Sequence, residues 1–199
     1  MKEYSQILPL PPCTPRCRRY DSRMDTSSLI VADYNRLVNY AKRSAQIEAC
    51  RWYDDAKSFA SDLAYIHTLS LEQAASVISA FSPRVTWARN KFLATQFLCG
   101  EPVKCLKLSL RNAEKAKIQG FAALNGMKTH NFARAISGDE SAVVIDTWMM
   151  QACGHPRKSL NKREYNLMAE AVREVAAMRG WKPAHMQALI WIMARGRAQ

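Results

Sequence analysis

Residues 124–132 read LNGMKTHNF, and after a short connection residues 143–149 read VVIDTWM. In the first segment a glycine turn comes directly before a basic helix. In the second segment an apolar run ends in one carboxylate, Asp146, at the start of another helix. Because Asp146 follows a buried run, its ionised form needs a helix amino terminus or a nearby cation to stabilise it. Lys128, eighteen positions upstream, is a candidate for that cation or for a separate nucleophile.

Two capping boxes predict where helices begin on either side of these segments. Ser70 with Gln73 predicts a helix over residues 71–81, and Asn161 with Glu164 predicts the start of a long helix. Apolar residues of the long helix recur at steps of three, four and three, which predicts a stripe that faces the core. The residues of this stripe are Tyr165, Met168, Val172 and Val175.

Prolines and apolar periodicity predict the remaining helices. Pro83 is expected in the first turn of a helix that carries Trp87, and Pro183 is expected to start the last helix. Helical spacing of apolar residues also predicts helices from Ser28 onward, over 52–66 and over 110–118. No segment shows sustained strand alternation, so the predicted fold class is all-α.

Composition favours a soluble chain with a polyanionic partner. The net charge is +12, and residues 104–134 hold seven Lys or Arg against one acid, which suits contact with nucleic-acid phosphates. The apolar fraction of 48% excludes a mainly disordered chain, and no apolar run is long enough for a membrane span. We expect a cytoplasmic monomer with a flexible basic tail over residues 1–27 and one helical domain over residues 28–199.

The cysteines and histidines do not predict a metal site. Of six cysteines only Cys13 and Cys17 lie close together, which supplies half a zinc site at most, and no two of the four histidines have metal-ligand spacing. We therefore predict no metal and no cofactor.

The two central segments resemble the helix-hairpin-helix (HhH-GPD) DNA glycosylase superfamily typified by endonuclease III. In that family a glycine hairpin is followed by Lys-Thr, as at Lys128-Thr129. A Val-Asp-Thr then supplies the catalytic aspartate at the interval found here between Lys128 and Asp146. Weaker similarity to the family occurs in the same order at 79–82 with Asn90-Lys91, at 112–116 and at 185–197. The resemblance implies a helical fold with two lobes around a cleft and double-stranded DNA as the partner.

The chain departs from the family pattern at three points. It offers only Gly126 where the usual hairpin has two glycines, and it carries Phe81 where many members have a glutamine that fills the gap left by an extruded base. It also ends where some members begin an iron-sulfur loop, so no cluster is expected. The shortened form is similar to phage-encoded members of the superfamily.

Three sets of residues are predicted to form the site. The resemblance implies that Asp146 and Lys128 are catalytic, and that the hairpin and the helix start after Phe81 contact DNA. The predicted DNA contacts are Asn125, Gly126, Thr129, His130, Arg84, Trp87 and Phe81. The predicted walls of the substrate pocket are Trp148, Trp52 and Tyr53.

These residues suit base excision, in which a carboxylate stabilises positive charge on the sugar while the bond to a flipped, damaged or modified base breaks. If the Lys128 amine attacks C1′ instead, the enzyme is also an AP lyase. Other interpretations stay open: Asp146 as a helix N-cap without a catalytic part, Lys128 as a phosphate contact, and Trp87 as a core residue. The alternatives for the whole chain are a phage-type enzyme that modifies DNA bases on the same fold, and a DNA-binding module without turnover.

Overall fold

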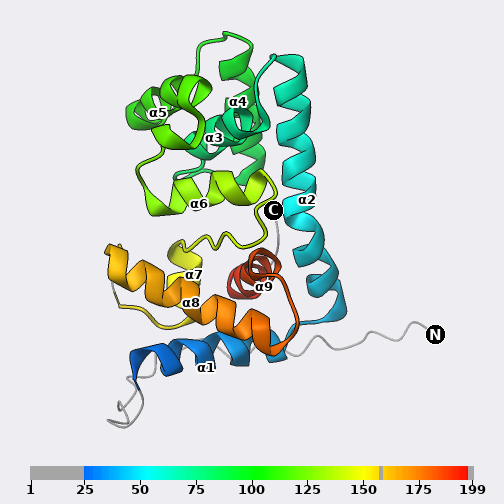
Figure 1. Cartoon of the computed structure of the whole chain (residues 1–199), viewed down its shortest axis with the longest axis vertical. Coiled ribbons are helices and arrows are strands. Elements are labelled where there is room, and N and C mark those ends of the chain that lie inside the picture. Colours follow the sequence, from blue (N-terminus) through cyan, green and yellow to red (C-terminus); the bar gives the residue numbers. More distant parts are fainter. Residues whose placement is uncertain (1–24, 157–158, 197–199) are drawn as a thin grey trace, which may run out of the picture.

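The computed structural model describes residues 25–156 and 159–196, and these ranges contain helices and no strand (Figure 1). The all-α prediction is therefore confirmed for this part of the chain. The helices are α1 Thr26–Asn39, α2 Arg43–Ile66, α3 Leu71–Phe81, α4 Trp87–Leu98, α5 Lys107–Gln119, the 3-10 turn η1 Gly120–Ala123, α6 Met127–Ile136, α7 Thr147–Ala152, α8 Lys162–Met178 and α9 Pro183–Arg195. None of them is long and apolar enough to cross a bilayer.

Local capping explains why several helices start where the sequence predicts. Ser70 and Gln73 form the predicted capping box of α3, and Asn161 and Glu164 form that of α8. Such boxes satisfy two backbone N–H groups that have no partner inside the helix. The predicted stripe of α8 is buried at all four positions, and α9 begins at Pro183 as expected.

Three predicted helix starts are wrong, and one of them is that of α5, which begins at Lys107 rather than at residue 110. Helix α4 begins at Trp87 rather than at Pro83, because Thr86 accepts a hydrogen bond from the Arg89 N–H and Arg84 has a φ of 63°, which no right-handed helix contains. Helix α2 begins at Arg43, well before residue 52. The sequence did not predict these first turns because they are mostly exposed and carry no apolar stripe. The predicted tail lies outside the described residues up to residue 24, while Thr26 and Ser27 already belong to α1.

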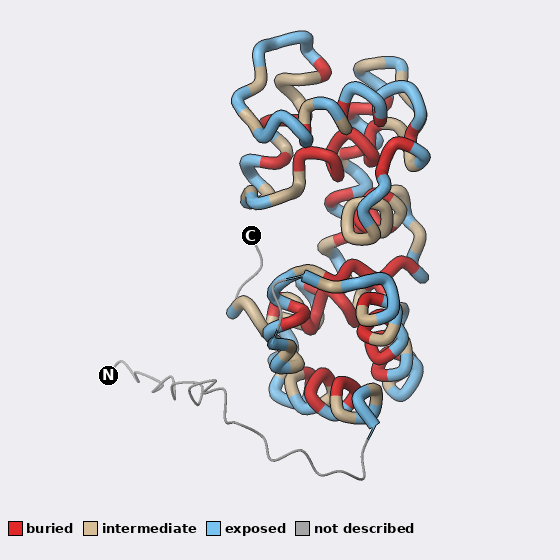
Figure 2. Tube along the Cα trace, turned by 90° about the vertical axis from the view of Figure 1, so that its left-hand side faces the viewer, coloured by how far each residue is buried: buried red, intermediate tan, exposed pale blue. Residues whose placement is uncertain are grey.

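The helices form two groups, and α2 runs alongside both (Figure 1). In one group α4, α5, η1 and α6 pack around α3, whose residues 74–81 are all buried. In the other, α1 and α9 pack against α8, and α7 packs against α9. Helix α2 contacts α3 and α6 in the first group and α9 in the second. The buried apolar side chains form one cluster. Buried residues occur in both groups of helices (Figure 2).

The connection from α6 to α7 passes between the two groups and delivers Asp146 (Figure 1). The Tyr165 hydroxyl donates to the Val143 carbonyl at 2.9 Å and accepts from the Ile145 N–H at 3.1 Å. On the other side, the Tyr34 hydroxyl donates to the Met149 carbonyl in α7 at 3.1 Å. Buried hydroxyls of α8 and α1 therefore hold the backbone on either side of Asp146.

Candidate active site

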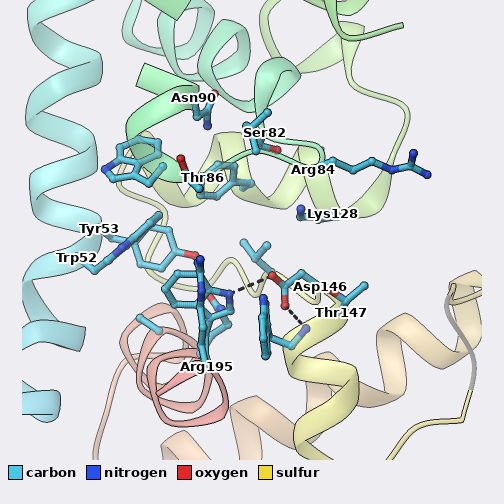
Figure 3. Close-up of a pocket in the computed structure, with 18 residues that line it drawn as sticks. Trp52, Tyr53, Ser82, Arg84, Thr86, Asn90, Lys128, Asp146, Thr147 and Arg195 are labelled. Atoms are coloured by element: carbon cyan, nitrogen blue, oxygen red, sulfur yellow. Dashed lines mark hydrogen bonds between the residues drawn. The ribbon is translucent and has the colours of Figure 1, made fainter. Parts of the chain in front are cut away.

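Asp146 is the N-cap of α7, and three hydrogen-bond donors hold its carboxylate. Oδ1 accepts from the backbone N–H groups of Trp148 at 2.9 Å and of Met149 at 3.1 Å. Oδ2 accepts from Nε1 of Trp191, in α9, at 3.0 Å (Figure 3). The amino end of a helix and these N–H dipoles stabilise negative charge on the carboxylate.

The three bonds leave one face of the Asp146 carboxylate available. An ionised carboxylate has about four lone-pair sites, two on each oxygen. Trp148 and Met149 use the two on Oδ1, and Trp191 uses one on Oδ2. One site on Oδ2 is left for a substrate atom or a water molecule.

Asp146 lies on the wall of a cavity of about 340 Å³ between the two helix groups (Figure 3). Six aromatic side chains line this cavity: Trp52, Tyr53, Trp87, Phe132, Trp148 and Trp191. Three cations line it as well, namely Arg84, Lys128 and Arg195. An aromatic cavity of this size with a few polar groups is typical of sites that hold a small planar ligand.

The cavity brings together seven of the residues that the sequence predicted for the site. They are Asp146, Lys128, Arg84, Trp87, Trp52, Tyr53 and Trp148. The ring of Trp87 also packs against Trp52 at 5.4 Å and against Phe132 at 6.3 Å between ring centroids. Trp87 is therefore both a packed aromatic residue and part of the cavity wall.

Phe81 is buried and does not line the cavity, which corrects its prediction as a DNA contact. Its side chain is 1% exposed and packs against Phe97 at 5.6 Å between ring centroids. As the last residue of α3, the helix at the centre of its group, Phe81 points into the core. Arg84, three residues later, is exposed and lines the cavity. It adopts a left-handed backbone conformation.

The other predicted DNA contacts lie at the amino end of α6, before and in its first turn. Asn125 and Gly126 are exposed, while Thr129 and His130 are half-buried. Gly126 is the N-cap without a side-chain cap, and the first turn holds no acidic residue. The backbone N–H groups of this turn, with Lys128 beside them, suit an anion. The ring of His130 makes an edge-to-face contact with the ring of Phe121, with centroids 5.9 Å apart.

Sequence reasoning missed one stripe of cavity residues on α9. Gln187, Trp191 and Arg195 are spaced by four residues, so they share one helix face, and all three line the cavity. The Arg195 guanidinium lies 4.9 Å from the Trp191 ring centroid and 5.8 Å from that of Trp148. A polar and aromatic stripe in a helix that is otherwise apolar could have identified these positions.

Within the described residues no group of three or more His, Cys, Asp or Glu side chains could hold a metal ion. Cys50, Cys99, Cys105 and Cys153 are free thiols. The pair Cys13 and Cys17 lies outside the described residues.

The chain belongs to a family described as "Family of unknown function (DUF7178)", and the match covers residues 20–198. No curated protein and no solved structure matches it. The family description assigns no activity.

Proposed function

We propose that this protein is a DNA glycosylase-like enzyme that binds double-stranded DNA, flips a damaged or modified base into the cavity and cleaves its N-glycosidic bond. The observation that carries this proposal is the position of Asp146. An anchored carboxylate with one free lone-pair site lies in an aromatic cavity, and Lys128 lines the same cavity. Flipped bases are held between aromatic and apolar side chains in such cavities.

The reaction uses Asp146 as a fixed negative charge. As the bond from C1′ to the base breaks, the base leaves with the bonding electrons and positive charge develops on the sugar. The free face of the Asp146 carboxylate stabilises that charge. A water molecule then attacks C1′ and loses its proton to the carboxylate or to solvent, which leaves an abasic site. Because three donors already hold Asp146, the carboxylate does not have to reorganise during the reaction.

Lys128 supports an alternative course of the reaction in the same site. If its uncharged amine attacks C1′ in place of water and displaces the base, opening of the sugar ring gives a covalent Schiff base. Loss of a C2′ proton then expels the 3′ phosphate and cleaves the DNA strand, and water hydrolyses the Schiff base to free the lysine. If its amine stays charged, Lys128 instead contacts the phosphate beside the flipped nucleotide. The amino end of α6 and Arg84 supply further anion contacts near the cavity.

The arrangement of helices supports a helix-hairpin-helix glycosylase fold. The α5 to α6 connection precedes the Asp146 segment in the chain, and the cavity lies where the two helix groups meet. In this proposal the two groups are the lobes of that fold, and the turn before α6 is its DNA-binding hairpin. The excess of basic residues over 104–134 suits a DNA partner.

The proposal is tested with labelled duplexes that carry a single uracil, 5-hydroxymethyluracil, 8-oxoguanine, thymine glycol or alkylated base, treated with and without hot alkali. We expect excision of at least one base by the natural protein. We expect Asp146→Asn to lower the rate at least about 100-fold, because the amide keeps the cap and loses the charge. Cleavage without alkali that is lost in Lys128→Gln would establish the lyase step.

Asp25→Asn is the matched control, because Asp25 also caps a helix, accepting from the Ser28 N–H at 2.8 Å, and does not line the cavity. It should retain full activity. If every duplex stays intact while the protein binds DNA tightly, base excision of these lesions is refuted and a DNA-binding module without turnover is favoured.

A further inference from the structure

Two buried carboxamides line the cavity besides the groups that the proposed reaction uses. Gln187 comes from α9 and is 4% exposed, and Asn90 comes from α4 and is 2% exposed. Figure 3 shows Asn90 on the side of the cavity that faces Tyr53, Asp146 and Arg195. Buried amides are nearly always hydrogen-bonded, so their partners need to be identified.

Tyr53 determines which end of the Gln187 amide is available. The Tyr53 hydroxyl donates to Oε1 of Gln187 at 2.6 Å. Burial raises the pKa of Tyr53 well above its usual value, so the hydroxyl keeps its proton and stays a donor. The Nε2 amide group of Gln187 has no partner among the described residues. Gln187 therefore presents its N–H donors to the contents of the cavity, while Tyr53 engages Oε1.

The Asn90 amide is not satisfied at either end. Its Oδ1 is buried without a hydrogen-bond partner, and its Nδ2 also has none among the described residues. Leaving a buried polar group unpaired costs about 1–3 kcal/mol. The Nδ2 group of Asn90 and the Nε2 group of Gln187 are donors without a partner among the described residues at the wall of this aromatic cavity, and a planar ligand with acceptor atoms along its edge suits both. A nucleobase has both the flat faces and the polar edge for this.

We propose that Gln187 and Asn90 select a keto base, one that presents a carbonyl oxygen to the Gln187 amide, over a base that presents an amino group there. This inference rests on the proposed function, because the base is the one flipped into the cavity beside Asp146. Uracil and cytosine differ in this respect at C4, where uracil has a carbonyl and cytosine an amino group. An amino group against the Gln187 N–H₂ places donor against donor, and Tyr53 prevents the amide from turning over.

The test uses free nucleosides, so that neither DNA binding nor catalysis is needed. Isothermal titration calorimetry of the full chain should show deoxyuridine binding at least about tenfold more tightly than deoxycytidine, the ratio expected when one buried hydrogen bond is lost. Gln187→Glu places an acceptor at the same position and should reverse the preference, which an unfolded chain cannot do.

Tyr53→Phe is the milder variant, and it keeps the ring while removing the hydroxyl that holds the amide. The Gln187 amide can then turn over, so the preference for deoxyuridine should fall towards a ratio of one. Equal affinity of the natural protein for the two nucleosides, or no binding of either, overturns the inference. A preference for deoxyuridine that survives in both variants also overturns it.

The outcomes separate this inference from the proposed function. If the protein prefers deoxyuridine but excises no base from any duplex, base excision fails and the base selectivity of the cavity stands. If the protein excises bases in an Asp146-dependent way but shows no nucleoside preference, the proposed function stands and the assignment of Gln187 and Asn90 is wrong.

Discussion

At the scale of single residues, the observed N-cap of α7 and the catalytic part proposed for Asp146 are compatible. Its Oδ1 caps α7, while its Oδ2 accepts from Trp191 and keeps one free site towards the cavity. Because the capping hydrogen bonds go to Oδ1 only, capping leaves one lone-pair site of Oδ2 for the proposed reaction. In the proposed reaction the Trp191 indole is a positioning group, because it donates a hydrogen bond to the carboxylate from α9.

Trp191→Phe tests this positioning. The substitution keeps an aromatic ring on the cavity wall and removes the N–H that Asp146 Oδ2 accepts. A hydrogen bond to a charged group contributes about 1.5–3 kcal/mol, so we expect kcat to fall about 10-fold or more. KM should change little, and Oδ1 should still cap α7. Steady-state kinetics on the excised duplex, with thermal melting of both proteins, gives the result.

Trp181→Phe is the matched control, because Trp181 is half-buried and does not line the cavity. It should leave kcat unchanged. Equal kcat for Trp191→Phe and the natural protein would show that the indole N–H does not position Asp146.

At the scale of elements, one glycine sets the turn between α5 and α6. Gly120 has a φ of 57°, and a Cβ at this position would lie 2.3 Å from Oε1 of Glu72. The same Glu72 oxygen accepts from the Phe121 N–H at 2.9 Å, which joins α3 to η1. The turn that leads to α6 therefore depends on close contact between a glycine and a carboxylate of α3.

Gly120→Ala should lower the free energy of unfolding by more than the strain of a left-handed residue alone, which is about 1–3 kcal/mol. Urea denaturation measures this change. Gly100→Ala is the control for strain, because Gly100 has a φ of 77° and a Cβ there would meet nothing within 4 Å. If the two variants are destabilised equally, the contact with Glu72 has no energetic consequence.

The helices were predictable where their ends depend on local chemistry. The capping boxes at Ser70 and Asn161 and the proline at 183 gave correct starts, because each acts within one turn of chain. The start of α2 at Arg43 was missed because its exposed first turns have no periodic apolar residues. Pro83 was misplaced because proline suits a turn as well as a first helical turn, and Thr86 supplies the cap.

The cavity was predictable only in part, because it is assembled from distant segments. Asp146 could be identified from an apolar run that ends in a helix cap, and Trp148 comes two residues later. Asn90 could not be identified from the sequence. It lies between the exposed Arg89 and the half-buried Lys91 in α4, and only the packing of α2, α4 and α9 around one space makes it a cavity residue. The burial of Phe81 likewise depends on the packing around α3.

At the scale of the whole molecule, buried hydroxyl and thiol groups limit stability in alkali. Burial raises the pKa of Tyr34, Tyr53 and Tyr165 above the usual value for tyrosine, and it raises the pKa of the Cys153 thiol from 9.0 to about 11. Each group must stay neutral in the folded core, whereas in the unfolded chain it ionises at its ordinary pKa. The unfolded state then binds fewer protons, so stability decreases as the pH rises.

We expect the free energy of unfolding contributed by Cys153 to be fully present below pH 9 and to be lost as the pH rises through 11. Between these two pH values one such group lowers the free energy of unfolding by about 1.4 kcal/mol per pH unit. Urea denaturation between pH 8 and about 11 should therefore show a smaller slope for Cys153→Ala than for the natural protein. Cys99→Ala, at an exposed thiol, should leave the slope unchanged. Parallel profiles for all three proteins would contradict this assignment.

The aromatic walls of the cavity also give the molecule an internal optical reporter. The chain has five tryptophans, and four of them, Trp52, Trp87, Trp148 and Trp191, line the cavity. Indole emission responds to polarity and to stacked quenchers, so the tryptophan fluorescence of this protein reports on the cavity walls. In Trp181→Phe it comes only from them. The arrival of any flat ligand can then be followed in real time, without a dye and without knowing the ligand in advance.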